Sequence, residues 1–203
     1  MYYKQLVFIL ALGLVGCGSG SSSDSDGDFL KGSTETQAYA GTWIKNCEQR
    51  VVEDEEDEIY SVKAEITFSD GGEANREFWY YSDIACTDLL FSAKYEGQLT
   101  IDGEKILESG ETVDKITLLF SYASVAYYVQ SYADKADIYK FCGGDWTLGV
   151  YKDVRDCEIL GELELSIDIV YRDEDRLYYG DDAFLDTDGY PTRLSDEYLV
   201  LQK

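Results

Sequence analysis

The residues of this chain that could do chemistry are its cysteines and its carboxylates. The sequence contains five cysteines, 41 acidic residues, 17 basic residues and no histidine. The lack of histidine excludes the Ser-His-Asp and Cys-His mechanisms and removes the most common general base and zinc ligand. Carboxylate catalysis would need an identifiable pair of acids, and no pair stands out among so many. We therefore predict that the protein is not an enzyme and has no cofactor.

Acidic clusters could instead hold a cation. Asp186-Thr-Asp188-Gly189 sets carboxylate oxygens beside a tight turn, so Asp186 and Asp188 are the calcium candidates, and a plain turn is the alternative. The run Glu53–Glu58 is expected to be an exposed hairpin loop, and a divalent-cation site there is the alternative if its carboxylates converge. Asp24–Asp28 lacks the Glu that closes a calcium loop. We predict no metal centre beyond these candidates.

The whole chain is strongly acidic, with a formal net charge of −24 and a pI of about 4.1. Such a surface repels phosphate backbones and anionic lipid head groups, which argues against nucleic acid and against a domain lying flat on a membrane. The charge indicates a solvated surface, or else a cation or a cationic partner. The identity of any protein partner is not indicated.

The first cysteine, Cys17, has a different setting from the others. Met1-Tyr-Tyr-Lys4 is followed by an apolar run, Leu6–Val15, which is about half as long as a bilayer span and fits a signal peptide. Leu14-Val15-Gly16-Cys17 resembles the bacterial lipobox. The resemblance implies cleavage before Cys17 and acylation of this residue with chains such as palmitate, which would anchor the protein to the membrane. An ordinary secretory peptide with a free Cys17 is the alternative.

These features divide the chain into three parts. Residues 1–16 are the expected lipoprotein signal peptide, residues 17–38 a lipidated cysteine with a flexible Gly/Ser/Asp tether, and residues 39–203 a folded domain. Gly18 stands where an inner-membrane retention signal would place Asp. By analogy with enterobacterial sorting, we expect the outer membrane, either at its periplasmic face or at the cell surface.

Four cysteines remain in the folded domain: Cys47, Cys86, Cys142 and Cys157. An even number in an exported domain indicates two disulfides, for which three pairings are possible. We favour Cys47–Cys86, joining the first strand to a turn, and Cys142–Cys157. Each would stabilise the fold by roughly 3–4 kcal/mol. A cysteine metal site is the alternative, but the chain has no Cys-x-x-Cys pair.

Long stretches of alternating apolar and polar residues predict the strands that carry these cysteines. Ser61–Phe68, Leu89–Ile101 and Ile159–Ile169 each present an apolar face to a core and a polar face to water. Shorter candidates are Ala74–Tyr81, Lys115–Ser121, Trp146–Lys152, Leu177–Gly180 and Glu197–Gln202, besides the strand that opens at Gly41-Thr42-Trp43.

The strands should close into a barrel. Eight or nine antiparallel strands usually close to remove exposed edges, and Gly97 and Gly161 suit its sharp bends. Helical spacing predicts one short helix within Ser124–Lys140, which either plugs a mouth of the barrel or covers an outer face. The fold class is thus an all-β, antiparallel up-and-down barrel with a short helix.

Several motifs resemble a bacterial lipocalin-like lipoprotein family. They are Gly41-Thr-Trp43…Cys47-Glu48, Trp79-Tyr80-Tyr81-Ser82-Asp83…Cys86-Thr87, Tyr95-Glu-Gly97, Phe141-Cys-Gly-Gly-Asp-Trp146…Lys152-Asp153-Val154 and Leu177-Tyr-Tyr-Gly180-Asp181. The first two are also similar to the repeated ectodomain of a vertebrate membrane-bound Wnt inhibitor. The resemblance implies a lipocalin-like barrel in which Trp43 packs at one end. It also implies a later basic residue against that Trp, which the sequence does not identify.

The functional expectation follows from this fold. The leading hypothesis is a lipid-anchored envelope protein whose barrel binds a small apolar ligand or lipid, as the resemblance implies and the aromatic-rich strand faces favour. The alternative is a structural or interaction protein, an inhibitor or assembly accessory, that acts through its acidic loops. A small barrel can also be filled by its own side chains.

Overall fold

The computed structural model describes residues 36–51, 59–155, 157 and 165–203. The chain divides into two compact units, Met1–Lys31 and Gly32–Lys203, and every described residue belongs to the second. The predicted signal peptide, Cys17, the acidic run Glu53–Glu58 and Gly161 lie outside the described residues.

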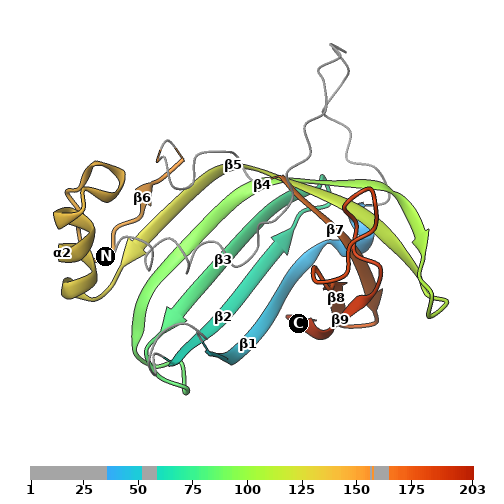
Figure 1. Ribbon diagram of the computed structural model, residues 1–203, viewed down its shortest axis with the longest axis horizontal. Coiled ribbons are helices and arrows are strands. Elements are labelled where there is room, and N and C mark those ends of the chain that lie inside the picture. Colours follow the sequence, from blue (N-terminus) through green and yellow to red (C-terminus); the bar gives the residue numbers. More distant parts are fainter. Residues whose placement is uncertain (1–35, 52–58, 156, 158–164) are drawn as a thin grey trace, which may run out of the picture. The chain divides into compact units, whose positions relative to one another are not determined.

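The second unit is an antiparallel barrel. Its described strands are β1 (Gly41–Val51), β2 (Ile59–Phe68), β3 (Glu73–Tyr81), β4 (Leu89–Ile106), β5 (Thr112–Tyr127), β6 (Lys152–Asp153), β7 (Leu165–Asp173), β8 (Arg176–Gly180) and β9 (Leu194–Leu201). They pair in the order β1-β2-β3-β4-β5-β7-β8-β9, and β9 returns to β1; β6 pairs only with β5 (Figure 1). The predicted up-and-down barrel of eight or nine antiparallel strands is confirmed, with eight strands in the barrel.

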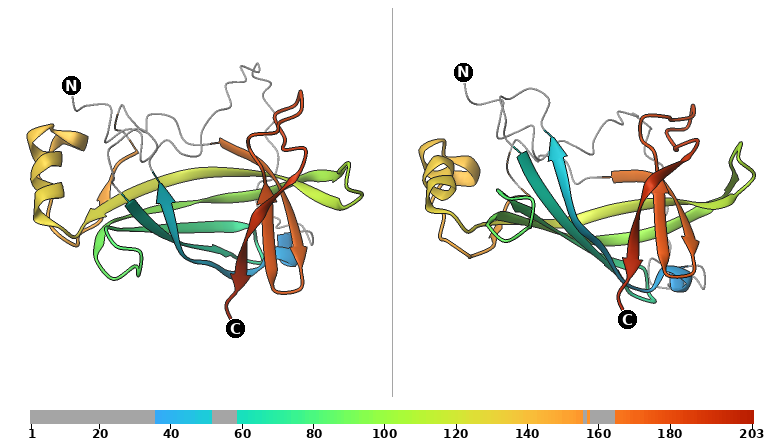
Figure 2. Two further views of the ribbon diagram at one scale, coloured as in Figure 1. Left: turned by 60° about the horizontal axis from the view of Figure 1, so that its bottom comes forward. Right: turned by 90° about the horizontal axis from the view of Figure 1, so that it is seen from below.

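Short helical elements flank the strands. The turn of 3-10 helix η1 (Thr36–Tyr39) precedes β1, and α2 (Gln130–Ile138) and η2 (Phe141–Gly143) follow β5. Figures 1 and 2 show α2 and β6 beside the end of β5, at the opposite end of the barrel from β8 and β9. Among the described residues, no helix is long and apolar enough to cross a membrane.

One half of the barrel interior is a packed core. The alternation predicted for β2 and β4 places Ile66, Phe68 and Leu99 on the inner face, where they are buried. They pack with inner residues of the other strands: Tyr39, Trp43, Ala74, Ile116, Leu118, Phe120, Val170 and Leu177. We call the end of the barrel near η1, where this core lies, the η1 end, and the other the α2 end.

The bend of β4 depends on Gly97. The register of β4 with β5 shifts between Glu96 and Gly97, so the two strands approach closely at this bulge. A Cβ atom at Gly97 would lie 2.2 Å from the Leu119 carbonyl oxygen. The bend predicted at Gly97 is therefore present, and only glycine fits there.

The helix begins later than predicted. Residues 124–127 continue β5 and pair with β4, with Val125 and Tyr127 opposite inner residues Ala93 and Phe91. Strand hydrogen bonds and burial of these two side chains outweigh the helical spacing. The predicted strand Trp146–Lys152 was wrong except for Lys152, because Gly143, Gly144 and Gly149 adopt positive φ and the chain there is irregular.

The expected orientation of the strand ending at Ile169 was also wrong over its described part. Ser166 and Asp168 stand opposite Leu118 and Ile116 of the core, so the polar side chains face inward. Leu165 and Ile167 face outward and are 55% and 38% exposed. Ile169 shares this outer face but is buried, because Tyr190 and Leu194 pack over it.

Candidate functional site

Trp43 closes the η1 end. Its side chain is fully buried, and its indole Nε1 donates to the Tyr39 carbonyl oxygen at 2.8 Å. The Arg172 guanidinium lies 5.2 Å from the centre of the Trp43 ring and donates to the Ala38 carbonyl oxygen. Arg172, on β7, is thus the basic residue that the resemblance to the lipocalin-like family predicts against Trp43. This end of the barrel is structural.

Cys47 is bonded to Cys86, with Cα atoms 5.9 Å apart. Asp83 organises the turn that presents Cys86: its carboxylate accepts from the backbone N–H groups of Ala85, Thr87 and Asp88. These hydrogen bonds, above all that from Asp88, lower the pKa of Asp83. The Asp-x-x-Cys part of the sequence motif is therefore a turn that supports a disulfide.

Cys142 is bonded to Cys157, with Cα atoms 5.2 Å apart, so both disulfides have the pairing that the sequence favours. The enclosed segment holds Trp146 against the α2 end. The Trp146 indole donates to the Phe141 carbonyl oxygen at 3.0 Å, and its ring meets Tyr127 edge-on at 4.7 Å. This disulfide fixes the aromatic group that ends the interior.

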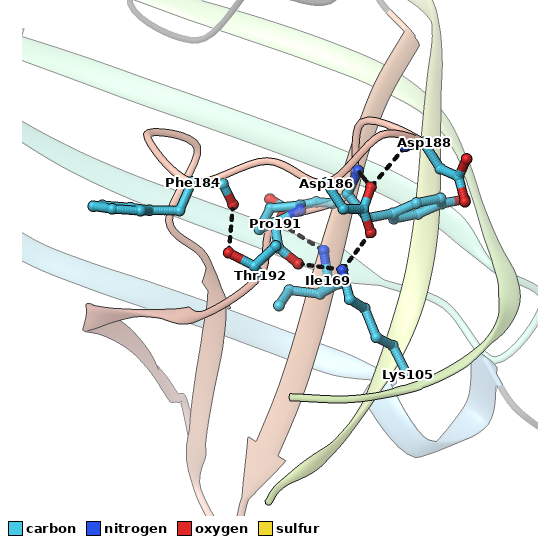
Figure 3. A network of polar contacts seen from close by, with 9 residues as sticks. Lys105, Ile169, Phe184, Asp186, Asp188, Pro191 and Thr192 are labelled. Atoms are coloured by element: carbon cyan, nitrogen blue, oxygen red, sulfur yellow. Dashed lines mark hydrogen bonds and ion pairs between the residues drawn. The ribbon is translucent and has the colours of Figure 1, made fainter. Parts of the chain in front are cut away.

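The calcium candidates do not converge on a cation position. Asp186 accepts from the Lys105 amino group at 2.5 Å and from the backbone N–H groups of Asp188 and Tyr190, both at 2.9 Å. Figure 3 shows the Asp188 carboxylate pointing away from Asp186. The Asp186 carboxylate is thus already hydrogen-bonded to Lys105 and to the backbone of its own turn. No cluster of three metal-ligating side chains occurs among the described residues.

Aromatic side chains line the inner face from the core to the α2 end. Tyr80 stacks on Phe91 at 4.3 Å, and Phe91 lies 6.2 Å from Tyr127. Nearer the core, Tyr95 lies 6.2 Å from Phe78 and 5.6 Å from Phe120. We call this set the aromatic stripe: Phe78, Tyr80, Phe91, Tyr95, Phe120 and Tyr127.

The aromatic stripe is unevenly buried. Phe78, Tyr80 and Tyr95 are partly accessible to solvent although they face inward, whereas Phe91, Phe120 and Tyr127 of the same stripe are buried. Phe78 stands between two alanines in the register, Ala64 on β2 and Ala93 on β4.

Arg76 projects from β3 into this part of the barrel. It is the cross-strand partner of Ile66 on one side and Tyr95 on the other, so it shares the face of the core. Its guanidinium lies 5.5 Å from the Phe78 ring centre and 5.6 Å from that of Phe120. Within the described part of the chain, no carboxylate forms an ion pair with it.

Two polar groups from the opposite strands lie near Arg76. Burial raises the pKa of Tyr179 on β8 to about 12, and the Arg76 charge partly offsets this. Burial also raises the pKa of Asp168 on β7 to about 6, against the lowering effects of the Ile169 and Gly180 N–H groups and of Arg76. The buried Tyr179 hydroxyl lies beside the Arg76 guanidinium, and its own O–H has no acceptor among the described residues.

The described inner face therefore combines partly accessible aromatic surface with the Arg76 guanidinium and, beside it, the Tyr179 hydroxyl. Sequence reasoning missed Arg76, Tyr179 and Asp168. A signal existed for Arg76, because a lone basic residue occupies an inner position among Ala74, Phe78 and Tyr80 on β3. No local signal marked Asp168, since it alternates with Ile167 and Ile169 as a water-facing residue would.

Comparisons with known proteins add no assignment. No protein-family model matches the chain, and no curated protein sequence matches it.

Proposed function

We propose that the protein is a lipid-anchored envelope lipoprotein whose barrel binds a small apolar molecule. The carrying observation is that three aromatic side chains of the inner face, Phe78, Tyr80 and Tyr95, are only partly buried although they point into the barrel. Apolar surface that water can reach inside a barrel gains free energy when an apolar ligand covers it, about 25 cal/mol for each Å².

The anchoring part of the proposal rests on the Leu14-Val15-Gly16-Cys17 motif. Acylation at Cys17 would hold the barrel near a membrane, and the residues between Cys17 and η1 would set its reach. Mass spectrometry of the membrane fraction tests this: we expect a chain that begins at an acylated Cys17. A water-soluble chain with a free Cys17 thiol would contradict it.

Ligand binding is tested with protein that begins at Gly18, which lacks the acylated cysteine and keeps the whole unit Gly32–Lys203. We expect the neutral apolar dye phenylnaphthylamine to bind with enhanced fluorescence at one site per chain. Replacement of an inner stripe residue, Phe78→Asp, should abolish binding, whereas outward-facing Ile167→Asp should not. A protein that binds no dye and carries no small molecule in native mass spectrometry would overturn the proposal.

Partner capture through Glu53–Glu58 stays a prediction, because this run lies outside the described residues. Neutralising it should abolish capture of a protein partner in a pull-down and leave dye binding unchanged.

A further inference from the structure

We propose that the barrel selects an amphipathic monoanion, an apolar chain with a terminal carboxylate, and binds this carboxylate between Arg76 and Tyr179. The inference rests on the proposed function and specifies the ligand class of the same site. It is carried by two neighbouring inner groups: a guanidinium that no described carboxylate pairs with, and a hydroxyl whose O–H has no described acceptor.

The first of these groups is the Arg76 guanidinium. Two further cations on the described inner face have partners: Lys45 pairs with Glu197 and Glu48, and Arg172 donates to backbone carbonyl groups. Arg76 contacts the faces of Phe78 and Phe120 and lies beside the Tyr179 hydroxyl, but it pairs with no carboxylate among the described residues. A guanidinium presents five N–H donors, and rings accept few of them, so a carboxylate would complete its coordination.

The second group is the Tyr179 hydroxyl. It is buried and lies within reach of the Arg76 guanidinium, and no acceptor for its own O–H occurs in the described part of the chain. Leaving a buried donor unsatisfied is unfavourable. An oxyanion beside Arg76 would accept from both side chains at once.

Asp168 does not fill this role. Its Oδ1 accepts from the backbone N–H groups of Ile169 at 2.7 Å and Gly180 at 3.0 Å, and no ion pair joins it to Arg76. Its presence also limits the ligand: a second negative charge nearby disfavours a dianion such as a phosphate monoester. One cation and one hydroxyl suit a monoanion.

The surroundings set the orientation of the ligand. Arg76 lies where the aromatic stripe meets the packed core, between Ile66 and Tyr95. An apolar chain can extend from there only along the stripe, over Phe78 and Tyr80 toward the α2 end. The carboxylate is thus innermost and the end of the chain lies toward Trp146.

The test compares three probes of equal chain length, each below its micelle concentration: dodecanoate, dodecanol and dodecylammonium. They displace phenylnaphthylamine from protein that begins at Gly18. Dodecanoate should bind more tightly than dodecanol, and dodecylammonium most weakly. Equal binding of dodecanoate and dodecanol would overturn the head-group proposal and leave the proposed function intact. Failure of all three probes, with no dye binding, would overturn both.

Variants locate the carboxylate. Arg76→Met should weaken dodecanoate binding by about 10-fold to 100-fold and leave dodecanol binding unchanged. Arg176→Met removes an exposed arginine of β8 and is the matched control, with no effect expected. Tyr179→Phe should weaken dodecanoate binding by about 5-fold to 10-fold, and Arg76→Lys should retain part of the preference.

A melting curve of each variant separates binding from folding. If Arg76→Met does not fold, Tyr179→Phe and Arg76→Lys carry the test. An equal loss of dodecanoate and dodecanol affinity in folded variants would show that Arg76 and Tyr179 only shape the barrel, and would overturn the proposal.

Discussion

At the scale of single residues, the barrel interior holds a carboxyl group in an unfavourable place. Asp168 is enclosed among core strands, and burial raises its pKa from 3.8 to about 6. Neighbouring charges act in opposite directions, Arg76 lowering the pKa and Asp182 raising it. Because the folded state holds this proton more tightly than the unfolded chain, Asp168 favours the fold only when protonated.

The consequence for stability is a pH dependence of defined sign. Below pH 3.8, the unfolded pKa, Asp168 is protonated in both states and does not lower the free energy of unfolding. Between pH 3.8 and about 6 its ionisation lowers the free energy of unfolding progressively, and above about pH 6 this loss is constant. The gap of about two pKa units corresponds to about 3 kcal/mol. We expect Asp168→Asn, which keeps the accepting oxygen, to exceed the parent protein in unfolding free energy by up to about 3 kcal/mol near pH 8 and to equal it near pH 4.

Urea unfolding at a series of pH values measures this difference. Comparison with the parent at each pH cancels the general effect of titrating many surface carboxylates. Glu108→Gln, an exposed change in the turn between β4 and β5, should show no such pH-dependent gain. A uniform loss of stability in Asp168→Asn at every pH would mean that the ionised carboxylate anchors the strands.

At the scale of elements, Arg172 connects β7 to η1 and β1. Its guanidinium covers the Trp43 ring and donates to carbonyl groups on both sides, those of Ala38 and Glu174. Arg172→Met should lower the free energy of unfolding by about 1–2 kcal/mol, since it removes one cation–π contact and charged hydrogen bonds.

The melting temperature of Arg172→Met reports this loss, and dye binding should be unchanged because the stripe lies elsewhere. Arg193→Met is a control, since Arg193 pairs with Asp181 in an exposed loop. If the two variants melt alike, the contact between β7 and η1 contributes nothing specific.

At the scale of the whole barrel, closure is uneven. β1 and β9 pair only at Trp43–Leu201 and Ile44–Val200, whereas β4 and β5 pair from Phe91–Tyr127 to Ile106–Thr112. Few hydrogen bonds hold the seam, so it should open before the rest. Hydrogen exchange should be at least about tenfold faster for amides of β9 than for those of β4. Equal protection of both strands would mean that the barrel opens only by global unfolding.

The sequence was sufficient for the barrel because most strands pack in a simple way. Ile66 and Leu99 alternate with polar residues on strands that meet water on one side, so period two identifies both strand and face. Period two assigned the wrong inner face to β7, because residues of the segment 181–194 cover part of its outer face while Asp168 faces the barrel interior. Which face of a strand is inner depends on what the rest of the chain covers, and this information is not local.

The site was harder to predict than the fold for a related reason. Arg76 and Tyr179 stand on β3 and β8, and only barrel closure brings them together. The disulfides were easier to predict, because each joins two cysteines whose segments are close in the sequence. Arg172 could not be chosen from the sequence because several basic residues follow the last long strand.

The positions of the tryptophans make the protein its own optical reporter. The chain has three, and the fold distributes them: Trp43 in the packed core, Trp146 at the α2 end and Trp79 opposite Ser92 and Lys63. Variants that keep one tryptophan each would emit from one location. The emission of Trp146 would change when a molecule binds along the stripe, and that of Trp43 would change when the core unfolds. Fluorescence alone would therefore distinguish ligand binding from unfolding.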